Sequence, residues 1–166
     1  MTDVLIAFAT RGGTTQSIAE RLGARLAATG QRATVAPVQD DPDPAAYEAL
    51  VIGAGVLGGS VYPAAGEWLT AHRAGLAGRP VAVFVTCLTV VADDAERRAQ
   101  ALAYPRQLAA VLPAPALDTR VFAGAYDPGR RRRWERAAAL LNRAPRGDFR
   151  DWKAVDAWAE ELAERL

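Results

Sequence analysis

The chain has few of the residues that hold structural metals and disulfides. Among its 166 residues there is a single cysteine, Cys87, and a single histidine, His72. One cysteine excludes an internal disulfide, and the lone histidine excludes a multi-histidine metal site. Cysteine-poor composition of this kind suits a reducing compartment, so we expect a cytoplasmic protein.

Net charge and long apolar runs are lacking as well. The 20 basic and 19 acidic residues give a net charge of +1, which is no reason to expect nucleic acid as a partner. No apolar run approaches the roughly 18 residues of a membrane span, and the N-terminus shows no signal-peptide pattern. We therefore expect a soluble protein that contacts a membrane at most peripherally.

The chain does have enough apolar sequence for one full core. Hydrophobic residues make up 51% of it, and a chain of this length is too short for two ordinary domains. We expect a single domain over residues 1–166, without repeats or low-complexity segments.

A turn rich in glycine and threonine lies near the N-terminus, between an apolar run at 4–8 and a segment with helical spacing from about Thr14 to Ala28. Its residues are Thr10, Arg11, Gly12, Gly13, Thr14 and Thr15. Glycines let the backbone approach a ligand, the helix start supplies N–H donors, and hydroxyls add more. The pattern predicts a phosphate site. The competing interpretation is an ordinary turn in which Thr14 or Thr15 caps the helix.

This turn differs from two well-known phosphate loops. No Lys-Ser or Lys-Thr pair follows the glycines, as a P-loop requires, and the spacing G-x-G-x-x-G of a dinucleotide site is absent. With these two patterns excluded, the sequence favours a hydroxyl-rich loop that binds a monophosphate.

Five short apolar segments predict strands at 4–8, 33–38, 50–53, 81–85 and 119–123. Helical patterns separate most of them, which favours an α/β fold with a five-stranded parallel sheet covered on both faces. Pro37 cannot donate to a sheet ladder, so the second strand belongs at an edge. The strand order 2-1-3-4-5 follows. Pro105 predicts a break between a helix ending near Ala103 and another at 105–111.

Two further loops follow the third and fourth predicted strands. The second loop contains Ala54, Gly55, Val56, Leu57, Gly58 and Gly59, and the third contains Thr86, Cys87, Leu88, Thr89 and Val90. In the order 2-1-3-4-5, both loops meet the first one at the switch point, outside the carboxyl ends of the strands. This convergence strengthens the phosphate interpretation.

These features resemble the flavodoxin superfamily. The first loop is similar to its FMN phosphate loop, and Val51–Ala54 with the glycines after it resembles its second flavin-binding segment. The resemblance implies a three-layer sandwich that binds one FMN. The first loop would hold the phosphate, with Arg11 adding charge, and the second and third loops would hold the ring.

Later segments resemble one branch, the menaquinone-dependent protoporphyrinogen dehydrogenases: Val121–Ala125, the Arg-rich stretch with Trp134, and Gly147–Trp152. This implies an FMN-dependent oxidoreductase that passes electrons to a quinone or another redox partner, although no side chain stands out as an acid or base. The mixed charges within 91–104 are a poor match for an anionic porphyrin. Two alternatives stay open, namely a small electron-transfer protein without its own substrate and a flavin-free interaction domain.

The ring loops depart from electron-carrier flavodoxins. They offer aliphatic side chains instead of aromatic ones, and few carboxylates surround them. A near-neutral site repels a reduced, anionic flavin less, so we expect a less negative reduction potential and two-electron chemistry. Tyr62 is the nearest aromatic candidate for the ring, and the alternative is that it packs against Trp68 in the core.

Three other features have two interpretations each. The cluster Arg130, Arg131, Arg132, Arg133 and Trp134 is either a solvated helix face or a patch for anionic lipid headgroups or substrate carboxylates at the inner face of the membrane. Cys87 is either redox active or inert packing. His72 falls late in a predicted helix, where a partner of the helix dipole is favoured over a catalytic base.

Overall fold

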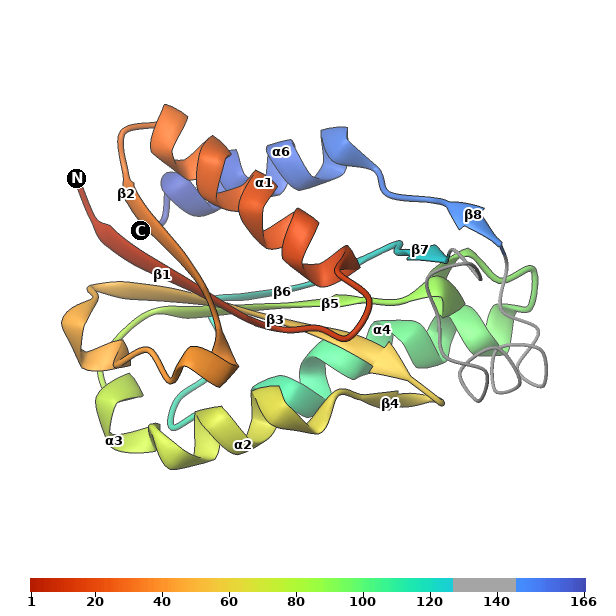
Figure 1. Ribbon diagram of the computed structural model, residues 1–166, viewed down its shortest axis with the longest axis horizontal. Helices are drawn as coiled ribbons and strands as arrows, with labels where there is room; N and C mark the ends of the chain where they lie inside the picture. Colours follow the sequence, from red (N-terminus) through yellow and green to blue (C-terminus); the bar gives the residue numbers. More distant parts are fainter. Residues whose placement is uncertain (127–145) are drawn as a thin grey trace.

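The computed structural model describes residues 1–126 and 146–166. Its centre is a parallel sheet in the order β2-β1-β3-β5-β6 (Figure 1). The strands are β1 (Asp3–Ala9), β2 (Arg32–Pro37), β3 (Ala49–Leu57), β5 (Val81–Thr86) and β6 (Asp118–Phe122). Because β4 (Ser60–Val61) only pairs antiparallel with the end of β3, the five parallel strands have the predicted order 2-1-3-4-5.

The strands form where the sequence is continuously apolar. Residues Val4–Ala9 of β1 and all of β5 are buried, as expected for parallel strands covered on both faces. β2 is the edge strand, and Pro37 pairs with Phe8 at its end. The prediction from that proline is therefore confirmed.

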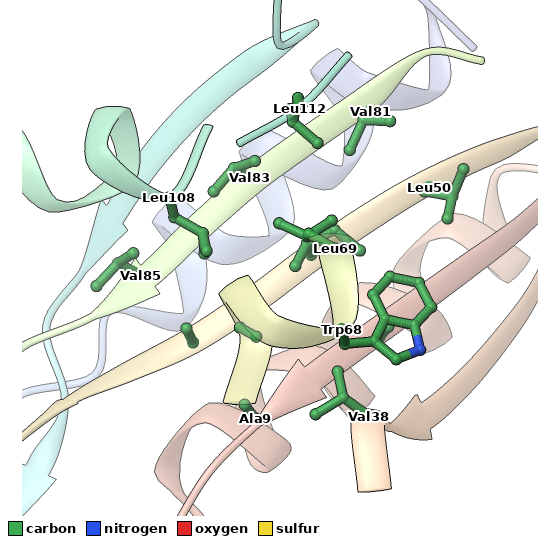
Figure 2. Packing of buried hydrophobic residues seen from close by; sticks show 14 of the residues in the cluster. Ala9, Val38, Leu50, Trp68, Leu69, Val81, Val83, Val85, Leu108 and Leu112 are labelled. Carbon is green, nitrogen blue, oxygen red and sulfur yellow. The ribbon is translucent and has the colours of Figure 1, made fainter. Parts of the chain in front are cut away.

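Helices cover both faces of the sheet, which gives a three-layer α/β sandwich (Figure 1). On one face lie α1 (Thr14–Ala28) and α6 (Trp152–Ala163), and on the other lie α2 (Pro63–Ala71), α3 (Arg73–Leu76) and α4 (Ala95–Ala109). Figure 2 shows the core on the second face, where Trp68 and Leu69 of α2 and Leu108 of α4 pack over the strands. Short 3-10 helices follow β2, precede β3 and follow β5: η1 (Val38–Asp40), η2 (Pro44–Ala46) and η3 (Leu88–Val91).

Two predicted boundaries are wrong. α4 continues through Pro105 as one helix. A proline in a helix interior loses one hydrogen bond, and here Ala101, Tyr104 and Leu108 are buried on the same helix, so packing against the sheet outweighs that loss. The third strand is longer than predicted, because β3 runs on to Leu57 and turns back into β4.

Two helices begin at aspartate caps. Asp94 and Asp151 cap α4 and α6, since their side chains accept hydrogen bonds from backbone N–H groups of the first turn. The Arg-rich stretch with Trp134 lies outside the described residues. Within 1–126 and 146–166, no helix has the length and apolar character needed to cross a membrane.

Candidate functional site

The first, second and third loops meet at the carboxyl ends of β1, β3 and β5. The hydroxyl oxygens of Thr15 and Thr86 lie 2.6 Å apart. Gly55 is beside them, since a Cβ at this position would lie 3.2 Å from Thr15 Oγ1 and 3.8 Å from Thr86 Oγ1. The structure therefore brings together the three loops that the strand order placed at one crevice.

The first loop leaves the start of α1 without a side-chain cap. The N-cap residue is Gly13, in the left-handed conformation with φ 82°, and it makes no side-chain hydrogen bond to the helix. Thr10 Oγ1 accepts a hydrogen bond from Gly13 N at 3.1 Å, which holds the turn. Thr14 and Thr15 are already in the first helical turn, so the ordinary-cap interpretation is wrong.

This geometry fits a phosphate group. The first N–H groups of an α-helix have no partner within the helix and carry partial positive charge. At α1 the cap side chain is missing, and a Cβ added at Gly13 would meet nothing within 4 Å, so the space beside Gly13 at the helix start is open. Arg11 is exposed on the same loop and adds a positive charge beside the helix start.

A fourth wall, which sequence reasoning missed, comes from the end of β6. Thr14 Oγ1 donates to the carbonyl of Ala125 at 3.3 Å. A Cβ at Gly124 would lie 3.5 Å from Thr14 Cγ2 and 4.0 Å from Leu88 Cγ. The strand order could have predicted this contribution, because the carboxyl end of every parallel strand lies at the same edge of the sheet.

Arg11 of the first loop contacts Tyr62, just after β4. Its Nε donates to the Tyr62 hydroxyl at 3.3 Å, and its guanidinium carbon lies 5.6 Å from the centre of the ring. The ring of Tyr62 is partly buried against the core cluster that contains Trp68. Tyr62 therefore joins the core with its ring and reaches the first loop with its hydroxyl.

The second loop is a β-hairpin. Val56 pairs with Val61, and Leu57 pairs with Ser60. The turn consists of Gly58 and Gly59 with φ angles of 60° and 83°, a geometry that two-residue hairpin turns require and glycine adopts without strain. The backbone at this position is therefore ordered by strand pairing, where the sequence predicted only a loop.

A residue outside all three predicted loops contacts this hairpin. The hydroxyl of Tyr104 on α4 donates to the carbonyl of Gly59 at 3.1 Å, and the tyrosine is only 2% exposed. Its burial raises the pKa of the phenol above its ordinary value, and the Cys87 thiol nearby adds to the shift. Tyr104 therefore keeps its proton and stays a donor at neutral pH.

The third loop continues into η3, which Cys87 caps. The side chain of Cys87 is 3% exposed, and its sulfur accepts a hydrogen bond from Thr89 N at 3.2 Å. This burial and this bond favour the packing interpretation for Cys87. Among the described residues, no group of three or more His, Cys, Asp or Glu side chains is placed to hold a metal ion.

The remaining candidates lie elsewhere. His72 is the C-cap residue of α2, and its Nε2 lies 2.6 Å from Asp41 Oδ1. His72 therefore lies at the C-terminal end of α2, whereas the crevice adjoins the N-terminal end of this helix. This position favours a partner of the helix dipole over a catalytic base. The cluster Arg130, Arg131, Arg132, Arg133 and Trp134 lies outside the described residues.

Comparisons with known proteins agree with this architecture. The profile of the family described as "Flavodoxin domain" matches residues 5–143. Flavodoxin 2 from Bacillus cereus has 20% sequence identity and a TM-score of 0.64, with 99% of each chain covered. The flavodoxin of Streptococcus pneumonia TIGR4 has 16% identity and a TM-score of 0.57, covering 98% of this chain and 99% of the other. An archaeal flavodoxin has 12% identity and a TM-score of 0.58, covering 98% and 96%. No curated protein sequence matches the chain.

Proposed function

Because the chain belongs to the flavodoxin domain family, we propose that it binds one FMN in the crevice described above and transfers electrons to a redox partner protein. Family and fold indicate FMN as the cofactor. When bound, FMN supplies reversible electron and hydride transfer through its ring. The observation that carries the proposal for the site is the uncapped, glycine-built N-terminus of α1.

The first loop would hold the phosphate. Backbone N–H groups at the start of α1 donate to anionic oxygens, and the hydroxyls of Thr10 and Thr14 lie at the same turn. Arg11 offsets part of the phosphate charge. The Thr15 hydroxyl faces Thr86 in this structure, so its contribution is to fix the first turn of α1 against β5.

The hairpin and η3 would hold the ring. Their side chains are aliphatic at Val56, Leu57, Leu88 and Val90, all partly exposed, so they exclude water from the ring and add no charge to it. Backbone N–H and C=O groups of the same segments are the available partners for polar ring edges. Compared with a site lined by carboxylates, these segments would repel negative charge on the ring less, whereas their exclusion of water would oppose it.

Oxidation of protoporphyrinogen with a quinone as acceptor is a second candidate function. One observation favours it. β7 (Ala125–Tyr126) pairs with β8 (Gly147–Asp148), so two of the segments that resemble the quinone-dependent branch lie together, and Ala125 contacts Thr14 at the start of α1. The resemblance to an enzyme branch therefore includes segments that adjoin the proposed phosphate loop, which is what favours an enzyme over a carrier.

Anaerobic kinetics separate the two candidates. The FMN-loaded protein is mixed either with protoporphyrinogen and a menaquinone analogue, or with a flavodoxin reductase, NADPH and cytochrome c as terminal acceptor. A carrier accelerates the reductase-to-cytochrome reaction and leaves the porphyrinogen at its spontaneous rate. Catalytic formation of protoporphyrin would instead establish the second candidate, and inactivity in both assays would contradict both.

A further inference from the structure

The hydroxyl of Tyr104 reaches from the buried face of α4 to the exposed tip of the hairpin. The tyrosine is 2% exposed, whereas Gly58, Gly59 and Ser60 at the tip are exposed. The hydrogen bond from Tyr104 Oη to the Gly59 carbonyl measures 3.1 Å and joins residues 45 positions apart. It is a tertiary contact between the second face of the sandwich and a segment of the candidate flavin site.

We propose that Tyr104 is a positioning residue that holds the β3–β4 hairpin in the conformation needed to bind the flavin ring. The proposal rests on the function proposed above. Tyr104 itself would not touch the flavin, because its side chain is enclosed in the core cluster on the α2 and α4 face.

The hairpin needs such support because its own pairing is short. Only two residue pairs join β4 to β3, Val56 with Val61 and Leu57 with Ser60, and an isolated two-stranded hairpin is marginal in water. The two turn glycines restrict the backbone least of all residues. Anchoring the Gly59 carbonyl to a buried side chain removes much of that freedom before the ligand arrives, which favours binding.

The anchor is itself rigid. Tyr104 lies on α4 together with the buried residues Ala101, Pro105 and Leu108, and its ring is packed in the core. An aromatic side chain has few rotatable bonds, so little entropy is lost when its hydroxyl is directed at one acceptor.

Tyr104→Phe tests the proposal, because it removes the hydroxyl and retains the ring in the core. Tyr47→Phe is the matched control, since Tyr47 precedes β3 at the opposite end of the sheet. Hydrogen exchange is followed by mass spectrometry on flavin-free protein, over peptides covering the hairpin and over peptides covering β1 and β5. FMN affinity and the visible circular dichroism of the bound flavin are then recorded for each variant.

In Tyr104→Phe we expect hairpin amides to exchange about fivefold faster and the FMN dissociation constant to rise about fivefold, the factor expected for one ordinary hydrogen bond. The flavin dichroism should change, and amides of β1 and β5 should keep wild-type exchange. Tyr47→Phe should match the wild type in the hairpin and in FMN binding.

Three results would overturn the proposal while leaving the flavin site standing: unchanged hairpin exchange, faster exchange spread evenly over the sheet, or a looser hairpin with unchanged FMN affinity and dichroism. Failure of the wild type itself to bind FMN would overturn the proposed function, and the positioning role with it. The wild-type titration therefore distinguishes the two failures.

Discussion

Thr15 and Thr86 place their side-chain oxygens 2.6 Å apart inside the protein, where they are 1% and 5% exposed. Aside from tyrosine, tryptophan and cysteine, they are the only residues with polar side chains that are buried in the described part of the chain. Thr15 is in the first turn of α1, and Thr86 is the last residue of β5. The hydroxyl pair therefore fixes the start of α1, where we propose that the phosphate binds, to the strand that leads into the third loop.

Replacing Thr86 with valine preserves shape and leaves the Thr15 hydroxyl buried without this partner. We expect the free energy of unfolding of flavin-free protein to fall by about 1–3 kcal/mol. Replacing both threonines with valine should cost less than the sum of the two single changes, because neither polar group remains to be satisfied. Urea denaturation of the four proteins measures the coupling, and strictly additive costs would show that the pair is not an interacting unit.

Arg11 should contribute to FMN affinity through the phosphate. In Arg11→Gln we expect FMN affinity at low salt to fall about two- to fivefold, the scale of an exposed ion pair, with riboflavin affinity nearly unchanged. Added salt should shrink the difference between the proteins, since exposed charges are screened.

Tyr62→Phe is the control for this change, because it removes the hydroxyl that Arg11 contacts and keeps the charge. Its ratio of FMN to riboflavin affinity should equal that of the wild type. Fluorescence quenching titrations give both constants. An equal loss of FMN and riboflavin affinity in Arg11→Gln would place the role of Arg11 in loop structure.

Asp118 should make stability depend on pH in the acid range. Burial alone would raise its pKa, but the hydrogen bond from Trp158, the Thr119 amide, Arg120 and Arg165 together lower it below 3.8. Because the folded carboxyl has the lower pKa, its contribution is present above pH 3.8 and is lost as the pH falls through the folded value.

Trp158 Nε1 donates to Asp118 Oδ2 at 2.8 Å, and a neutral amide oxygen is a weaker acceptor than a carboxylate, so Asp118→Asn should lower the free energy of unfolding at pH 7 by about 1 kcal/mol. The difference in free energy of unfolding between the wild type and Asp118→Asn should become smaller below about pH 4. Thermal unfolding between pH 2.5 and 7 checks this. A gap that stays constant over that range would show that the carboxylate charge is not responsible.

Much of the fold follows from local sequence. Apolar runs such as Val4–Phe8 mark the strands, and Pro37 sets the edge and thereby the strand order, as observed. The helix break predicted at Pro105 is wrong. A proline destabilises a helix locally, whereas the burial of α4 that outweighs this cost depends on the assembled sheet.

The candidate site was predictable to the level of its loops. Strand order alone brings Thr15, Gly55 and Thr86 together, as the structure shows. The structure shows that Gly13, with a φ angle of 82°, is the N-cap residue of α1 and that neither Thr14 nor Thr15 caps the helix. The residue pattern alone did not distinguish these three positions. The contacts of Tyr104 with Gly59 and of Thr14 with Ala125 span 45 and 111 positions and arise only from packing.

Titration of flavin-free protein with FMN and with riboflavin, followed by flavin fluorescence, is the decisive measurement for the proposed cofactor site. We expect saturable binding of one FMN per chain with quenched fluorescence. We also expect weaker binding of riboflavin, which lacks the phosphate that would bind at the start of α1. Protein that leaves FMN fluorescence unchanged at every concentration would contradict FMN binding, and equal affinity for the two flavins would contradict the assignment of the phosphate site.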